Sequence, residues 1–260
     1  MIAKIYKFYH SEFYERFNHL KGAHFLNRKL SSLIDLELET VDEEPTHIRE
    51  REWKNLIILD ALRYDIYSEK FSESDSITSV GSHSREFIKN TFSEGDWSDT
   101  VLVTANPHHS PEWFENATDR KIEDTFHAIY RTYETDWSNE GSVGADNLVR
   151  DVKSARKLFP DKKIIVHFMQ PHAPLVGSDK DTGHIRSMGE GSREEAVKAY
   201  RENLDYVLEY VNELMEFFDG RTVVTGDHGE LLGECDFYFR HFYGLNAKPV
   251  KQVPWHLINE

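Results

Sequence analysis

The sequence predicts an α/β protein of three layers, with a mainly parallel central sheet between helices. Four short apolar runs carry this prediction, because each is continuous rather than alternating and so suits a strand that is covered on both faces. Helical patterns separate the runs, and strands that alternate with helices are typical of βαβ units. The four runs are NLIILD (55–60), TVLVTA (100–105), KIIVHFM (163–169) and RTVVTG (221–226).

The chain divides into a short extension and one large domain. Its 260 residues suit a single α/β domain with a sizeable core. Residues 1–35 have apolar side chains at three- and four-residue spacing, which predicts a helix. Residues 38–51 are polar and acidic and contain a proline, as in a solvated linker. We therefore expect an N-terminal helical extension and linker over 1–52 and the main domain over 53–260.

Two helices of the main domain are clear from their apolar spacing. Over residues 194–218 the apolar side chains form one stripe, and Pro160 and Gly220 mark the two turns that lead from a helix into a strand. A serine-rich turn after Gly81 opens a shorter helix. Its inward side chains are expected to be Phe87, Ile88 and Phe92.

Charge and composition exclude several classes of protein. Lys and Arg number 31 against 46 Asp and Glu, and the net charge of −15 argues against a broad nucleic-acid surface. No apolar run approaches the ~18 residues of a membrane-spanning helix. The single cysteine, Cys235, excludes a disulfide framework and a cysteine-rich metal site. The charged, aromatic N-terminus does not resemble a signal peptide, so the expected location is cytoplasmic.

Polar side chains gather where the predicted strands end. In open α/β sheets, ligands bind beyond the carboxyl ends of the strands. Three of the four predicted ends carry a carboxylate or an imidazole, and the remaining one carries Thr104–Asn106. The three ends are Asp60, Gln170–His172 and Asp227–His228. This clustering is the first specific indication of a functional site.

A divalent cation site is the interpretation we favour for three of these residues. Asp227 and His228 directly follow a strand and lie between two glycines, which would permit the backbone angles that point both side chains at one cation. Asp60 ends an apolar strand, where an unpaired carboxylate is costly to bury. The alternative for the DHG turn is an ordinary polar surface turn.

A hydroxyl group near this site would supply a nucleophile. The turn SVGSHS (79–84) opens a helix, and the free N–H groups of a helix N-terminus attract phosphate and other anions. A serine hydroxyl close to a cation there can be deprotonated and act as a nucleophile. The alternative is an ordinary serine cap of the helix.

Two histidines are candidates for contacting a substrate. His172 lies between two prolines just past a strand, and His241 lies in a loop rich in aromatic residues. The alternative for His241 is a packing histidine. His167 lies inside a strand and is interpreted as a hydrogen-bonded core residue, and His108 and His109 as loop histidines.

In order and arrangement, these motifs resemble the sulfatase branch of the alkaline phosphatase superfamily. The resemblance covers about residues 53–258 and is carried by LDALRYD, QPHAP, TVVTGDHGELLGE and VPW. It implies an alkaline phosphatase-like fold and a metal-dependent hydrolase or transferase of phosphate, phosphonate or sulfate esters. It also implies three metal ligands, at Asp60, Asp227 and His228, and two histidines that contact the transferred group, at His172 and His241.

The sequence departs from the sulfatase pattern at the nucleophile. Sulfatases use a formylglycine made from Cys or Ser in a C/S-x-P-x-R context, whereas this chain has SHSR (82–85), without the proline. An unmodified serine is therefore expected instead of formylglycine. The family pattern places a threonine nine residues after the nucleophile, so Thr91 favours Ser82. Ser84 stays open as the alternative.

We therefore predict a metal-dependent hydrolase or transferase of phosphate or phosphonate esters that acts through a serine nucleophile. Ser82 is the predicted nucleophile and also a predicted metal ligand, beside Asp60, Asp227 and His228. Zn²⁺ or Mn²⁺ is favoured for this mixed oxygen and nitrogen set, with Ca²⁺ or Mg²⁺ as alternatives. The expected partner is an anionic ester, such as a glycan or lipid head group, and not a nucleic acid. A sulfatase and a non-catalytic anion- or glycan-binding protein are the alternatives.

Overall fold

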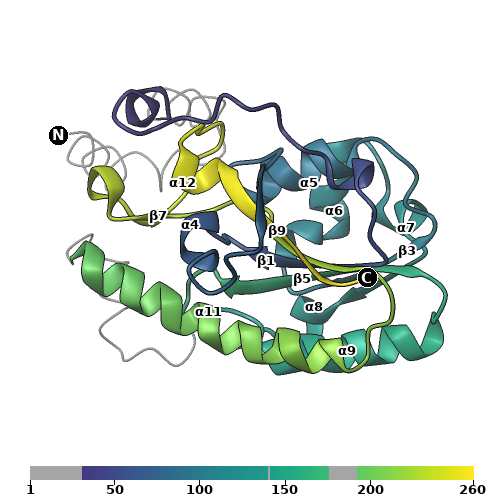
Figure 1. The fold of residues 1–260 in the computed structure, drawn as a ribbon. Helices are drawn as coiled ribbons and strands as arrows, with labels where there is room; N and C mark the ends of the chain where they lie inside the picture. Colours follow the sequence, from purple (N-terminus) through teal and green to yellow (C-terminus); the bar gives the residue numbers. More distant parts are fainter. Residues whose placement is uncertain (1–30, 140, 176–191) are drawn as a thin grey trace.

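A seven-stranded sheet forms the centre of the protein. The computed structural model describes residues 31–139, 141–175 and 192–260. The strand order is β2-β9-β6-β1-β5-β3-β4, and a separate two-stranded sheet pairs β7 with β8. Helices lie on both sides of the main sheet (Figure 1). The predicted three-layer α/β fold with a mainly parallel sheet is therefore confirmed.

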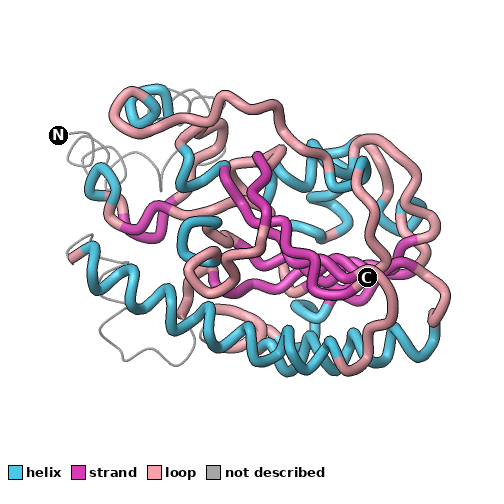
Figure 2. The backbone as a smooth tube through the Cα atoms, in the orientation of Figure 1, coloured by secondary structure: helices cyan, strands magenta, loops and turns pink. Residues whose placement is uncertain are grey.

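The central strands run parallel, so their carboxyl ends meet at one end of the sheet. β1 pairs in parallel with β5 on one side and with β6 on the other, and β3 pairs in parallel with β5 and β4. β9 is antiparallel to both of its neighbours, β6 and β2. Figure 2 shows the strands crossing the middle of the molecule. The strands are β1 (Asn55–Asp60), β2 (Asp75–Thr78), β3 (Thr100–Thr104), β4 (Ala128–Arg131), β5 (Lys163–Pro171), β6 (Thr222–Gly226), β7 (Leu231–Leu232), β8 (Tyr238–Arg240) and β9 (Gln252–Asn259).

The helices form the two outer layers. Figure 1 shows α9 and α11 along one face of the sheet and α5 and α6 on the other. α11 contains most of the long helix that the sequence predicts, and α5 is the shorter helix after the serine-rich turn. The α-helices are α4 (Tyr64–Tyr67), α5 (Ser84–Phe92), α6 (Pro111–Thr118), α7 (Ile122–Thr125), α8 (Thr132–Asp136), α9 (Ala145–Leu158), α11 (Arg193–Met215) and α12 (Lys248–Lys251). The short 3-10 helices are η2 (Ile48–Glu50), η3 (Pro107–His109) and η4 (Glu234–Asp236).

The buried strands supply apolar side chains to both layers, because successive residues of a strand point to opposite faces. In β1, Ile57 and Leu59 join the core beneath α9 and α11. Leu56 and Ile58 join the core beneath α5 and α6. All residues of β1 are buried, which explains why the sequence shows a continuous apolar run there and no alternation.

The antiparallel strand β9 was not predicted. It contains Pro254, and a proline argues against a strand because it has no N–H to donate to a neighbour. In the structure Pro254 lies opposite Ser76 of β2, and the strand pairs on both sides. This pairing brings the segment before β9 against the DHG turn, where the amide of Gly229 donates to the carbonyl of Val250 at 2.7 Å.

The predicted N-terminal helix lies mostly outside the described residues. Residues 31–35 are helical, and Ile34 is buried in a small apolar cluster formed mainly by residues of the β7–α12 region. Within the predicted linker, the amide of Thr46 donates to the carbonyl of Thr78 at 2.8 Å. The division of the chain after residue 52 stays a prediction. Across the described ranges, no helix has both the length and the apolar character needed to cross a membrane.

Candidate active site

Neighbouring parallel strands bring three of the predicted ligands together. Asp60 is the last residue of β1, and Asp227 and His228 follow the end of β6. His228 Nε2 lies 3.5 Å from Asp60 Oδ1 and 3.5 Å from Asp227 Oδ2. His167 of β5 approaches the same carboxylate, with its Nε2 3.6 Å from Asp227 Oδ2. We call Asp60, His167, Asp227 and His228 the inner cluster.

The inner cluster has the buried, unsatisfied atoms expected of a cation site. Asp60 Oδ1, Asp227 Oδ2 and His167 Nε2 are buried and have no hydrogen-bond partner among the described residues. Buried polar atoms are normally paired, so three orphaned atoms at one place indicate a missing partner. One ligand atom from each of these three residues lies within 4.8 Å of the others. Carboxylate oxygens with imidazole nitrogens suit a divalent transition metal, so the residues present fit such an ion.

The two carboxylates of the inner cluster have different electrostatic surroundings. Burial and the charge of Asp227 raise the pKa of Asp60 well above its usual value, although a hydrogen bond from Ser84 opposes them. Burial also acts to raise the pKa of Asp227, but His228 and His167 outweigh it and hold that pKa below its usual value. Two carboxylates this close repel each other, and a bound cation would relieve the repulsion.

Ser84 lies at the inner cluster. It begins helix α5, and its Oγ is 3.2 Å from Asp60 Oδ2 and 3.2 Å from His228 Nε2. The side chain is buried at the N-terminus of the helix, where free N–H groups favour an anion. The structure thus brings to the cluster the serine that the sequence left open as the alternative.

Ser82 faces a loop and is not brought to the other predicted ligands. Its Oγ lies 2.6 Å from Glu86 Oε2 and 2.9 Å from the carbonyl oxygen of Phe242. It also accepts hydrogen bonds from the amides of Gly244 at 2.8 Å and Leu245 at 3.2 Å. One buried hydroxyl therefore ties the turn before α5 to the loop before α12.

Replacing Ser82 by alanine is expected to lower stability and to leave catalysis nearly intact. The change removes the hydroxyl that contacts Glu86 and accepts from two amides, and each lost hydrogen bond costs about 0.5 to 1.5 kcal/mol. We expect a melting temperature several degrees lower and a kcat/KM close to the wild-type value. Thermal unfolding and ester cleavage, measured on one preparation, check this. If Ser82→Ala lost activity without losing stability, the result would support Ser82 as the nucleophile.

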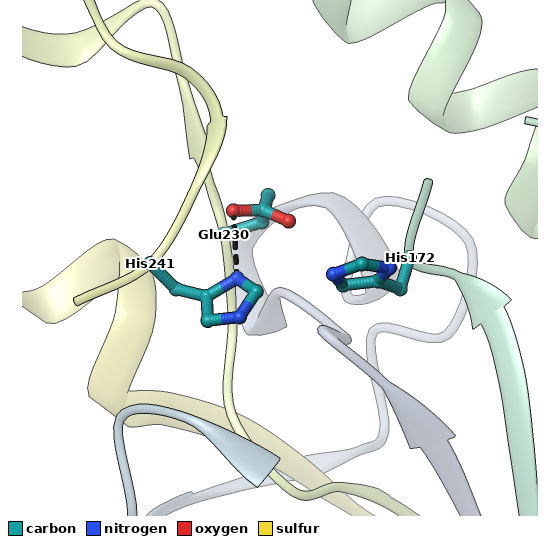
Figure 3. A group of neighbouring side chains, drawn as sticks. All are labelled: His172, Glu230 and His241. Carbon is teal, nitrogen blue, oxygen red and sulfur yellow. Dashed lines mark hydrogen bonds and ion pairs between the residues drawn. The ribbon is translucent and has the colours of Figure 1, made fainter. Parts of the chain in front are cut away.

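A second set of ligand-type side chains lies beside the inner cluster. His172, Glu230 and His241 each place one ligand atom within 4.8 Å of the others, and we call them the outer cluster. His241 Nδ1 is 3.1 Å from Glu230 Oε1, and Figure 3 shows the three side chains around one space. The rings of His241 and His228 have centroids 4.2 Å apart, so the two clusters adjoin.

The outer cluster contains the two predicted substrate-contacting histidines, His172 and His241. It also contains Glu230, which the sequence analysis did not identify. In the sequence, Glu230 directly follows the DHG turn, and this position was the signal that could have identified it. In the structure, its carboxyl group lies beside the two histidines. Burial and the neighbouring His228 hold the pKa of His241 well below its usual value. This shift favours the neutral form of the ring, which has a nitrogen lone pair that can bind a cation.

Other residues hold the inner cluster in place from behind. Asn106 Nδ2 donates to Asp60 Oδ2 at 2.8 Å. His109 Nε2 lies 3.2 Å from His167 Nδ1 in a hydrogen bond between two buried rings. His109 was interpreted as a loop histidine, but the structure buries it behind the cluster. Such outer partners orient the side chains that face a metal.

Gly229 is required by a close approach of two backbones. The sequence suggested that the glycines of the DHG turn supply unusual backbone angles, but neither has a positive φ. A Cβ at Gly229 would instead overlap the carbonyl oxygen of Pro249 and lie 3.1 Å from its carbonyl carbon. The turn is thus packed directly against α12. The glycines that do have a positive φ in the described ranges are Gly95, Gly141, Gly220, Gly233 and Gly244.

Gly229→Ala is expected to reduce both stability and activity. The added methyl group must push the turn away from Pro249, and such overpacking costs about 1 to 3 kcal/mol. His228 and Glu230 flank the glycine, so both clusters shift, and a misplacement of about 1 Å can cost about 100-fold in rate. Gly141→Ala is the control, since its Cβ would meet nothing within 4 Å and only its φ of +84° is strained. Equal activity of the two variants would contradict this account.

Comparison with known proteins finds similarity in three-dimensional structure. No protein-family model and no curated protein sequence matches this chain. The soluble domain of lipooligosaccharide phosphoethanolamine transferase A from Neisseria meningitidis has a TM-score of 0.50 and 13% identity, covering 84% of this chain and 80% of that chain. The integral membrane protein of the same name and organism has a TM-score of 0.52 and 13% identity, covering 97% of this chain and 59% of that chain. A zinc complex of the C-terminal periplasmic domain of EptC from Escherichia coli has a TM-score of 0.49 and 12% identity, covering 83% of this chain and 77% of that chain.

These comparisons confirm the expected fold and overturn the expected location. The similar structures include an integral membrane protein and its soluble domain, so the cytoplasmic location predicted from the sequence is wrong. That prediction rested on missing signal-peptide features, and a missing feature carries no positive information about location. The chain spans 59% of the length of the integral membrane protein.

Proposed function

We propose that this chain, which has the α/β fold of the sulfatase-like alkaline phosphatase superfamily, is a metal-dependent enzyme that transfers or hydrolyses phosphate or phosphonate esters through Ser84. One observation carries the proposal. The Ser84 hydroxyl lies 3.2 Å from both Asp60 and His228, beside buried carboxylate oxygens that have no hydrogen-bond partner in the described part of the chain. A hydroxyl next to the ligands of a cation is placed for activation as a nucleophile.

Asp60, Asp227 and His228 would hold the cation. His167 adds a further nitrogen ligand, since one ligand atom each of Asp60, His167 and Asp227 lies within 4.8 Å of the others. A divalent cation bound there lowers the pKa of a nearby hydroxyl and neutralises charge on phosphoryl oxygens. The mixed oxygen and nitrogen ligand set favours Zn²⁺ or Mn²⁺ over Ca²⁺ or Mg²⁺.

Ser84 acts as the nucleophile of an in-line displacement. Its Oγ forms a bond to phosphorus while the bond from phosphorus to the leaving oxygen breaks. Its proton passes to the adjacent Asp60 Oδ2, at 3.2 Å, or to solvent. Water or an acceptor alcohol then attacks the phosphorylated serine and releases Ser84. The identity of that second nucleophile decides between a hydrolase and a transferase.

The outer cluster binds the rest of the transferred group. His172 and His241 contact its non-bridging oxygens, and Glu230 fixes the ring of His241 through the hydrogen bond at 3.1 Å. We propose a lipid or glycan head group with a phosphate ester as the substrate class. The name of the Neisseria meningitidis transferase, which refers to lipooligosaccharide, supports this choice.

A panel of aryl esters tests the proposal. Metal-free protein is reloaded with Zn²⁺ or Mn²⁺ and assayed on p-nitrophenyl phosphate, an aryl phosphonate monoester and p-nitrophenyl sulfate. We expect cation-dependent cleavage of the phosphorus esters and little cleavage of the sulfate, because SHSR (82–85) lacks the context for formylglycine. Faster cleavage of the sulfate would identify a sulfatase. Cleavage of none, with cation bound, would identify a non-catalytic anion- or glycan-binding protein.

A further inference from the structure

A row of rings leads from the inner cluster toward the surface beside Ser84. The ring of His83 lies 6.1 Å from that of His228, and the ring of His108 lies 5.8 Å from that of His83. Trp113 of α6 comes next, 5.4 Å from His108. These centroid distances are those of neighbouring rings in contact. The row therefore runs without a break from the buried His228 to the half-buried Trp113.

Arg85 stands at the outer end of this row. It follows Ser84 directly in α5, it is exposed, and its guanidinium carbon lies 5.2 Å from the ring centroid of Trp113. Among the described residues, no carboxylate forms an ion pair with Arg85. Acidic residues outnumber Lys and Arg by 46 to 31 in this chain, so a cation without a carboxylate partner beside the proposed nucleophile is informative.

We propose that Arg85, held on the face of Trp113, binds a second anionic group of the substrate, a carboxylate or a further phosphate attached close to the reacting phosphorus. The inference rests on the proposed function. It specifies in addition that the substrate has a negatively charged substituent next to the reacting phosphate. Adjacent Cα atoms are about 3.8 Å apart, so one arginine side chain reaches from the nucleophile to a substituent a few bonds away. A guanidinium binds carboxylate and phosphate through paired N–H donors, and it repels an amine.

Three p-nitrophenyl phosphodiesters with the same leaving group test the proposal. Their second ester group is propyl, 2-aminoethyl or 2-carboxyethyl, so they differ at that position mainly in charge. We expect wild-type protein loaded with cation to give a kcat/KM for the 2-carboxyethyl ester about fivefold above that for the propyl ester, mainly through a lower KM. The 2-aminoethyl ester should be the poorest substrate. Added salt should shrink the difference, because the guanidinium is exposed.

Variants of Arg85 assign the preference to the proposed residue. Arg85→Gln should bring the ratio between the 2-carboxyethyl and propyl esters to about one and leave the metal content unchanged. Arg85→Lys should keep part of the preference. Arg51→Gln is the matched control, because the Arg51 guanidinium also lies over a tryptophan ring, that of Trp255 in β9, at 5.0 Å. It should leave all three rates unchanged.

Two results would overturn the proposal. The first is a wild-type preference for the 2-aminoethyl ester, and the second is the same ratio of rates in wild type and Arg85→Gln. Either of these would leave the proposed phosphoester chemistry standing, because the diesters would still be cleaved. Cleavage of p-nitrophenyl phosphate but of none of the diesters would overturn this inference alone, and cleavage of neither by the loaded wild-type protein would overturn the proposed function as well.

Discussion

Replacing Ser84 by alanine is expected to abolish ester cleavage while the cation stays bound. The proposed displacement needs the Ser84 hydroxyl to attack phosphorus, and loss of a nucleophile costs roughly 10³-fold or more in rate. The proposed ligands Asp60, Asp227 and His228 should keep their positions in this variant, so its metal content should match that of wild type. Initial rates on an aryl phosphate and metal analysis of the same samples measure the two effects separately.

The covalent intermediate gives an independent measurement. Rapid quenching of the wild-type reaction, followed by peptide mass spectrometry, should find one phosphoryl group on Ser84. Ser82→Ala should show the same modified peptide, because the Ser82 hydroxyl contacts Glu86 and the loop before α12 and does not face the inner cluster. Ser84→Thr keeps a hydroxyl and should retain part of the activity. A phosphoryl group found on Ser82 would show that the assignment to Ser84 is wrong.

Asp227→Asn is expected to remove most of the cation-dependent stability and the activity with it. A cation at 100 times its dissociation constant stabilises the folded state by about 2.7 kcal/mol. For a domain of this size that corresponds to a rise in melting temperature on the order of 5 to 10 °C. The neutral amide binds a cation poorly and does not balance its charge, so the variant should lose most of this rise. Melting curves with EDTA and with added Zn²⁺ or Mn²⁺ measure it.

Two further variants control for charge and for position. Asp99→Asn removes an exposed carboxylate that pairs with Lys162, and it should leave the cation-dependent rise intact. His172→Ala should lower turnover and keep most of the rise, because His172 belongs to the outer cluster. The measurement starts from protein shown to be metal-free. If neither EDTA nor added cations then changed the melting temperature, the result would argue against the inner cluster as a metal site.

The layers of the fold could be predicted because burial on both faces leaves a direct mark on the sequence. Strands such as Asn55–Asp60 contribute side chains to two cores at once, so they are apolar throughout and stand out from their surroundings. β9 has no such mark. It contains a proline and a histidine, which interrupt the apolar pattern of a strand. Its pairing depends on neighbours far away in the sequence.

The candidate site could be predicted in part, for a similar reason. The rule that ligands gather at strand ends brought Asp60, Asp227 and His228 into one hypothesis, and the structure places them together. The choice between Ser82 and Ser84 depends on which way each hydroxyl faces in the turn before α5. That direction follows from the backbone path and from the loop at 242–245, and residue spacing does not contain it.

The two clusters are joined by a single tetrapeptide, Asp227–Glu230. Consecutive Cα atoms are about 3.8 Å apart, so the Cα atoms of His228 and Glu230 cannot separate by more than about 7 Å. Covalent geometry therefore keeps the backbone positions of one residue from each cluster within this distance, however the surrounding helices pack.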